Sequence, residues 1–115
     1  MPADRRPLPL IAGAACLALA ASADAQTGGL DAQITRGHDL ARTVCASCHD
    51  VEANGPSPNR RAPPFRILAG HYVELTLHMK LVEIAETGHY DMPPIAVHSD
   101  QVRDLAAYIN SLPRP

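Results

Sequence analysis

The sequence predicts a small all-α domain, and three observations lead to this fold class. Apolar residues recur three and four positions apart in several segments, which is the spacing of one face of a helix. The connections between these segments are rich in proline, glycine and other turn formers. The chain of 115 residues has room for one domain, and its 1 Phe, 3 Tyr and 0 Trp predict a core that needs another group at its centre.

The first 25 residues are interpreted as a cleaved secretory signal peptide. Arg5 and Arg6 precede the apolar run Leu10–Ala23, and small residues follow where a signal peptidase cleaves. A membrane anchor needs about 20 apolar residues, so this run is too short to be one. We expect cleavage after Ala25, which places residues 26–115 in the periplasm as one exported domain.

Two other export signals are weaker matches. A lipoprotein box ending at Cys16 would cut the apolar run in half. A twin-arginine signal would need apolar residues directly after Arg5 and Arg6, and the sequence lacks them.

A helix is predicted from Leu30 to the residue before Cys45, after a polar lead-in at residues 26–29. Its apolar or small face comprises Leu30, Ile34, Gly37, Leu40, Ala41 and Val44. Gly37 costs about 1 kcal/mol against alanine inside a helix, so it predicts close approach of another helix. Tolerance of glycine on a loosely packed face is the alternative.

Residues 45–49 read Cys-Ala-Ser-Cys-His, the attachment pattern for a c-type haem. Cys45 and Cys48 have the spacing to form thioethers with the two vinyl groups on one porphyrin edge, and His49 follows at once to bind iron. Removal of the signal also removes Cys16, so these two are the cysteines of the exported domain.

Three other interpretations of this motif carry less weight. A thioredoxin-like pair needs a preceding strand in a βαβ frame. A zinc site needs two more ligands, taken from His71, His78, His89 and His98. A disulfide between Cys45 and Cys48 would be strained and would leave His49 unexplained.

Residues 50–66 consist largely of turn formers and are predicted to be a loop that a ligand holds in place. The next segment, Tyr72–Thr87, alternates at first like a strand. Its length and a stripe of apolar residues four or three apart favour a helix, with Gly88 as its C-cap. The stripe comprises Val73, Leu77, Leu81 and Ile84.

Prolines stiffen the following loop, residues 88–94. Met92 is the one apolar and flexible side chain of this loop, and its thioether is a soft ligand. A last helix is predicted from an N-cap at Ser99, with Asp100 in its first turn, to a stop at Pro113. Its inner face carries Val102, Leu105, Ala106, Tyr108, Ile109 and Leu112.

These motifs, taken in order, resemble a small bacterial class I cytochrome c over residues 30–113. The resemblance rests on residues 45–49, Gly37, Ala62–Phe65, Gly88–Pro94 and Asp104–Ile109. It implies an all-α class I cytochrome c fold of three to five helices wrapped around one covalently bound haem c.

The resemblance also implies roles for single residues. Gly37 and Tyr108 would meet where the first and last helices cross. Met92 matches the second axial ligand beside His49. The proline whose carbonyl accepts a hydrogen bond from the ligand histidine matches Pro64 or Pro63, and we name Pro64; the pair stands 15 and 14 residues after His49, unlike the commonest spacing.

Two other side chains are alternatives to Met92 as ligand. His89 lies three residues earlier in the same loop and would give bis-histidine iron. Met79 lies in the middle of a predicted helix, where filling the core is its expected role. We favour Met92 because thioether ligation and a proline-stiffened loop occur together in electron carriers.

The expected function is one-electron transfer between periplasmic or membrane redox partners, with no open site for a substrate. A cytochrome subunit of a larger dehydrogenase is the alternative, followed by a haem sensor or enzyme with a labile sixth ligand. The net charge of −2 excludes the basic surface of a nucleic-acid binder. The candidate charges for docking of partners are Arg60, Arg61, Arg66 and Lys80.

Overall fold

The computed structural model describes residues 15–89 and 92–115, and within them it contains helices and no strand. Helix α1 (Ala15–Leu40) continues into a single π turn, η1 (Ala41–Cys45). Helices α2 (Phe65–His71), α3 (Glu74–Thr87) and α4 (Ser99–Ser111) follow. The all-α prediction is confirmed.

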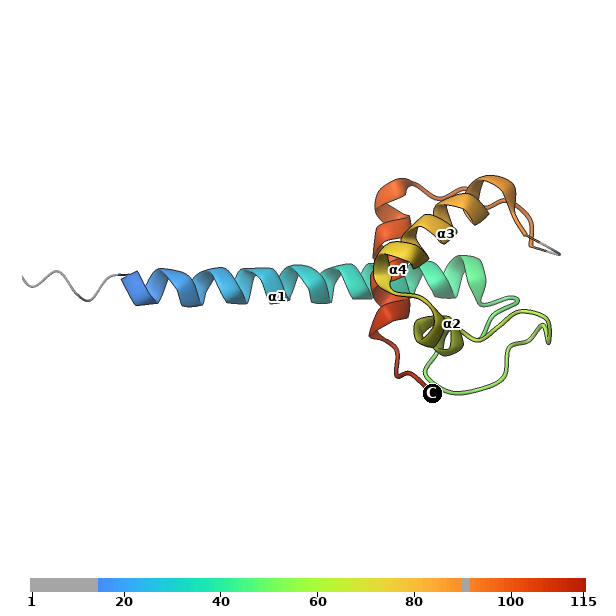
Figure 1. Ribbon diagram of the computed structural model, residues 1–115, viewed down its shortest axis with the longest axis horizontal. Helices are drawn as coiled ribbons and strands as arrows, with labels where there is room; N and C mark the ends of the chain where they lie inside the picture. Colours follow the sequence, from blue (N-terminus) through green and yellow to red (C-terminus); the bar gives the residue numbers. More distant parts are fainter. Residues whose placement is uncertain (1–14, 90–91) are drawn as a thin grey trace, which may run out of the picture.

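Helix α1 is longer than the predicted helix, because residues 26–29 are helical and do not form a separate lead-in. Figure 1 shows its first half projecting away from the other helices and its last turns crossing α4. The predicted cleavage point after Ala25 lies inside α1, and residues 1–14 of the expected signal peptide lie outside the described residues. No helix in the described part of the chain is both long and apolar enough to span a membrane.

The crossing of α1 and α4 depends on Gly37. A Cβ atom at this position would collide with the backbone carbonyl of Asp104 and would lie 2.7 Å from Cβ of Tyr108. The absence of a side chain therefore lets the two helix backbones touch, as the sequence predicted.

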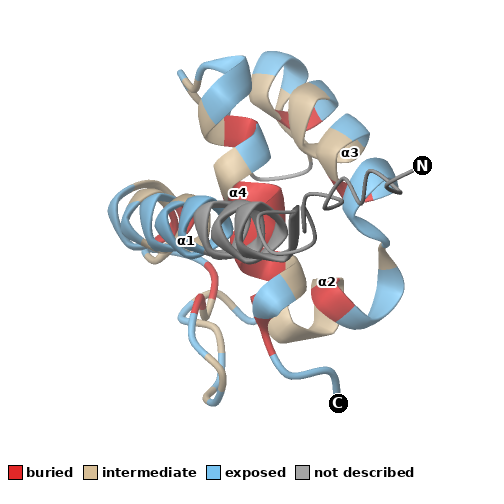
Figure 2. Cartoon of the chain, turned by 90° about the vertical axis from the view of Figure 1, so that its left-hand side faces the viewer, coloured by how far each residue is buried: buried red, intermediate tan, exposed pale blue. Residues whose placement is uncertain are grey.

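The core is centred on α4, whose buried residues Figure 2 shows as the red faces at the middle of the domain. Leu105 and Ile109 of α4 are almost completely buried, and Leu77 of α3 and Phe65 of α2 pack into the same cluster. Few of these side chains are large, as the composition indicated.

Helix α3 confirms the helical interpretation for residues 74–87 and corrects two details. Leu77 and Ile84 are buried, whereas Leu75 and Met79 are exposed. Met79 therefore does not fill the core: it stands two residues after Leu77, which is about 200° around a helix at 3.6 residues per turn. Val73 precedes the helix and is exposed, so the apolar stripe begins at Leu77 and not at Val73.

The ends of the helices follow local chemistry. Gly88 caps α3 with φ +67°, as predicted for a C-cap glycine. The N-cap of α4 is His98, one residue before the predicted Ser99. The side chain of Gln101 accepts a hydrogen bond from the backbone N–H of His98 at 2.8 Å, which is the reciprocal half of a capping box.

Tyr108 ties α4 to the segment that follows His49. Its hydroxyl donates a 2.6 Å hydrogen bond to the backbone carbonyl of Val51, and both residues are buried. The ring of His38 lies against the tyrosine ring at 4.8 Å between centroids, and its Nε2 lies 3.0 Å from Oε1 of Glu52. Burial, with smaller contributions from Glu52 and Asp50, raises the pKa of Tyr108 to about 12.

Replacing Tyr108 by phenylalanine is expected to lower the free energy of unfolding by about 1–3 kcal/mol at neutral pH, because the buried carbonyl of Val51 loses its donor. The difference should narrow as the pH rises from about 10 to about 12. Over that range the unfolded wild-type chain loses the phenol proton before the folded one does, so the stability present below pH 10 is lost. Denaturant unfolding of both proteins at pH 7 and pH 11 measures this, and an equal difference at both pH values would contradict it.

Candidate functional site

The two thiols of the Cys-Ala-Ser-Cys-His segment stand at the end of the π turn. The backbone N–H of Ala46 donates to the carbonyl of Ala41 at 3.0 Å, which closes the wide turn. The N–H groups of Cys48 and His49 then both donate to the carbonyl of Cys45, at 3.1 and 2.9 Å. The chain curls tightly here, with Cys45 buried, Cys48 exposed and both thiols free.

The buried thiol is a weak acid. Burial, and to a smaller degree the nearby Cys48, raises the pKa of Cys45 to about 11. The thiol of Cys45 is therefore protonated at neutral pH, in contrast to the low-pKa thiol of a redox-active pair.

His49 is held in one orientation from two sides. Its Nδ1 lies 2.8 Å from the backbone carbonyl of Pro63, and its ring lies 5.3 Å from that of Phe65. A carbonyl can only accept, so Nδ1 carries the proton and Nε2 is the nitrogen with a lone pair for iron. His49 is 8% exposed, so these contacts lie in the interior of the domain.

The proline that holds His49 is Pro63 and not Pro64, which corrects our choice between the two. The carbonyl of Pro64 instead accepts the N–H groups of Ile67 and Leu68, at 2.9 and 3.4 Å. It thereby starts α2, and so it is turned away from the histidine by the helix that it begins.

Two adjoining cavities, of about 210 and 240 Å³, lie between the histidine and the loop that carries Met92. They share one wall, formed by Cys45, His49, Arg61, Pro63, His89, Met92 and Ile95. Aliphatic and aromatic side chains line most of the remainder of the larger cavity: Phe65, Leu68, Tyr72, Leu77, Leu81, Ile84 and Leu105.

These cavities fit the haem that the motif predicts. They are mainly apolar. The imidazole of His49 and the free thiol of Cys45 line both cavities, and the free thiol of Cys48 lines the smaller one. An apolar macrocycle with two thioether bonds and an axial imidazole needs this set of groups.

Met92 and His89 both line the two cavities, so the structure brings both candidate ligands to the same place. Their backbones pair with each other: N–H of His89 donates to the carbonyl of Met92 at 3.1 Å, and N–H of Met92 donates back at 2.7 Å. Gly88 permits this tight loop, because a Cβ there would collide with the carbonyl of Met92. Residues 90 and 91 between them lie outside the described part.

The other interpretations of the motif find no support among the described residues. No three His, Cys, Asp or Glu side chains gather there as a zinc site would require. Cys45 and Cys48 are not joined in a disulfide. No strand precedes Cys45, so the frame of a thioredoxin-like pair is missing from the part of the chain that the structure describes.

One of the four predicted docking charges has another role. Arg66 is about three-quarters buried and forms an ion pair with Asp50, so it is corrected to an internal contact. Arg60 and Arg61 are exposed on the loop beside the cavities. Lys80 lines the larger cavity and lies 2.9 Å from Glu83.

The sequence pattern did not single out Asp50, Tyr72 and Ile95. Tyr72 and Ile95 line the larger cavity, but they stand at the edges of their segments, where no helical period marks them. Asp50 directly follows His49, and its position next to the predicted iron ligand is the sequence feature that could have identified it.

The fold and the site together define a small all-α domain with apolar cavities, an imidazole and two free thiols that fit a haem. The protein family described as cytochrome C oxidase, cbb3-type, subunit III matches residues 32–109. Cytochrome c-552 of Bradyrhizobium diazoefficiens is 34% identical over 97 residues, which cover 84% of this chain and 90% of that protein. No solved structure matches the chain. The chain therefore belongs to this cytochrome c family: it is a small class I cytochrome c, with covalently bound haem c as its cofactor.

Proposed function

We propose that this protein is a periplasmic one-electron carrier in which His49 and Met92 would hold the haem iron. The observation that carries the proposal is the placement of His49 and Met92 on the walls of the same apolar cavities, beside the thiols of Cys45 and Cys48. The bound haem supplies a ferric/ferrous couple that moves one electron at a time. Membership of a cytochrome c family supports electron transfer as the function.

The chain would favour the reduced state by two means. A thioether is a soft ligand that stabilises ferrous iron, and an apolar cavity keeps water from the haem. The cavities are lined mainly by apolar side chains, with Arg61 and Lys80 as the cationic exceptions. With His49 and Met92 both holding the iron, no ligand position would be left open for a substrate, which suits a carrier.

Electrons would enter and leave on the side of Cys48. Ser47 and Cys48 are exposed, and the exposed Arg60 and Arg61 lie on the neighbouring loop. Brief encounters between redox partners bury small areas, often below about 1,200 Å². A small rim of this kind, flanked by positive charge, would select partners with an acidic docking surface.

The second candidate function is that of a subunit in a larger redox complex. The matching family is described as a subunit of an oxidase, which favours this alternative over a haem sensor. Size-exclusion chromatography of the protein as it occurs in its host, at low and high salt, separates the two. A carrier elutes alone at both salt concentrations, and a subunit elutes with its complex.

Export to the periplasm by a signal peptide over residues 1–25 remains part of the proposal. The arginine pair and the apolar run Leu10–Ala23 support it. The intact mass of the mature protein tests it, because cleavage after Ala25 and attachment of one haem give a single expected value.

Replacing Met92 by alanine tests the axial ligand. The ferrous variant is expected to bind carbon monoxide, because the sixth position becomes open, whereas the ferrous wild type is expected not to. Met79→Ala is the matched control: the chemistry of the change is the same, but Met79 is exposed on α3, so its spectra should equal those of the wild type. A Met92→Ala variant that stays low-spin and refuses carbon monoxide would assign the position to another residue, with His89 as the next candidate.

A further inference from the structure

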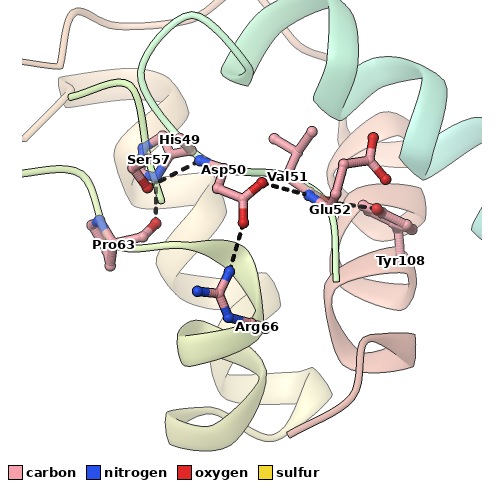
Figure 3. A network of polar contacts seen from close by, with 8 residues as sticks. All are labelled: His49, Asp50, Val51, Glu52, Ser57, Pro63, Arg66 and Tyr108. Atoms are coloured by element: carbon pink, nitrogen blue, oxygen red, sulfur yellow. Dashed lines mark hydrogen bonds and ion pairs between the residues drawn. The ribbon is translucent and has the colours of Figure 1, made fainter. Parts of the chain in front are cut away.

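Asp50 connects the segment after His49 to the start of α2. Its backbone carbonyl accepts the N–H of Phe65 at 2.9 Å, and its Oδ2 accepts a hydrogen bond from Nη1 of Arg66 at 2.5 Å. The side chains of Asp50 and Arg66 are only 11% and 24% exposed. Figure 3 shows this pair directly beside the hydrogen bond between His49 and Pro63.

The carboxylate of Asp50 is itself held in place. Its Oδ1 accepts the backbone N–H of Glu52 at 3.3 Å, and the backbone N–H of Asp50 donates to Oγ of Ser57 at 3.0 Å. These contacts, all visible in Figure 3, fix Asp50 relative to its own loop, so that the ion pair to Arg66 fixes α2 relative to that loop.

The contacts of Asp50 with Phe65 and Arg66 lie close along the chain to the hydrogen bond between His49 and Pro63. His49 is one residue before Asp50, and Pro63 is two residues before Phe65. The chain between them, residues 51–62, contains no helix or strand that would set the distance between His49 and Pro63. Two sets of contacts therefore set the separation of 2.8 Å between Nδ1 and the carbonyl oxygen. The backbone N–H of Asn59 donates to the carbonyl of Cys48 at 3.0 Å, and Asp50 is joined to residues 65 and 66.

We propose that Asp50 and Arg66 are positioning residues that hold the carbonyl of Pro63 against His49 and thereby lower the reduction potential of the haem. The inference deepens the proposed function, since it rests on His49 as an iron ligand. An acceptor on the second nitrogen of a ligating imidazole makes that imidazole a stronger donor. A stronger donor favours ferric iron, so a looser hydrogen bond raises the potential.

The effect of position is separable from the effect of charge. Loss of the negative charge of Asp50 alone would raise the potential, and loss of the positive charge of Arg66 alone would lower it. In the double variant Asp50→Asn with Arg66→Gln the two charge effects largely cancel, because the charged groups lie 2.5 Å apart. A rise in the reduction potential of that variant would therefore come from a displaced Pro63 carbonyl.

The experiment is a redox titration of the holoprotein with covalently attached haem. The double variant is expected to raise the ratio of reduced to oxidised protein about three- to tenfold at a fixed potential, where tenfold equals about 59 mV for one electron. The Nδ1 proton of His49, followed by NMR in the reduced protein, should exchange faster with solvent. Arg36→Gln with Asp104→Asn is the matched control, because it removes an Arg–Asp pair with a 2.7 Å contact between α1 and α4, whose residues do not line either haem cavity. Its potential should equal that of the wild type.

A double variant with attached haem, an unchanged potential and an unchanged exchange rate would overturn the inference. If the double variant carries no haem, Arg66→Gln decides: charge alone lowers the potential, and release of the Pro63 carbonyl raises it. Arg66→Lys keeps the charge and should restore most of the wild-type value. Failure of the proposed function would be visible separately, because the wild type would then lack attached haem or the spectrum of histidine-ligated iron.

Discussion

A chain without its two attachment thiols, Cys45→Ser with Cys48→Ser, is expected to show no cooperative thermal unfolding. Without thioether bonds the haem is not retained, and the cavities around His49 are then filled by water or collapse. An empty apolar cavity costs about 24 cal/mol per Å³, so leaving the two cavities empty, at about 210 and 240 Å³, would cost about 5 and about 6 kcal/mol. Domains of this size have a total stability of about 5–15 kcal/mol.

The measurement is a thermal scan by circular dichroism, with intact mass to establish whether haem is attached. The wild-type holoprotein should give one sharp transition, and the double-serine chain a shallow, gradual change. A sharp transition in the haem-free chain would show that the protein part alone forms a sufficient core. The few large side chains in the composition argue against that result.

Replacing Gly37 by alanine is expected to cost about 3 kcal/mol of unfolding free energy or more. The new methyl group would overlap the backbone carbonyl of Asp104 and crowd Tyr108, so α1 and α4 would have to separate. Backbone atoms cannot rotate away as the end of a flexible side chain can. The separation would also loosen the contacts between α4 and the segment after His49.

Gly70→Ala provides the matched control for this prediction. At that position in α2 the nearest atom to a new Cβ is Cδ of Pro115 at 3.6 Å, an ordinary contact. Alanine should therefore be neutral or stabilising there, by up to about 1 kcal/mol from helix propensity. Denaturant unfolding of both variants measures the contrast, and similar values for Gly37→Ala and Gly70→Ala would refute the close-contact role of Gly37.

The features that the sequence predicted well are those with a short-range pattern. The motif at residues 45–49 specifies its chemistry in five consecutive residues. Gly37 could be interpreted because a glycine in a helix interior costs stability and needs a reason. Gly88 marked the end of α3 for a similar reason, since a positive φ favours glycine.

The features that it predicted poorly depend on how irregular segments fold. Pro63 and Pro64 are adjacent, and only the start of α2 decides which carbonyl faces His49. An arginine in a polar loop is usually a surface residue, so the sequence placed Arg66 at the surface. Its partner Asp50 is 16 residues away, across a loop whose residues show no apolar periodicity. Met79 was misplaced because alternating and helical patterns overlap at the start of α3.

The π turn at Ala41–Cys45 sets where the thiol of Cys45 lies relative to Gly37, the residue at which α1 packs against α4. The number of residues between Gly37 and Cys45 therefore matters for the proposed haem attachment. In an α-helix, residues eight apart drift by about 80° around the axis. In the wider π turn each residue advances by a smaller angle around the helix axis. Gly37, Ala41 and Cys45 therefore stay buried on one face of α1 and η1. Deletion or insertion of a single residue between Gly37 and Cys45 would swing the thiol by about 100° while leaving every motif intact. The spacing between Gly37 and Cys45 is therefore a further requirement for the proposed attachment of haem at Cys45.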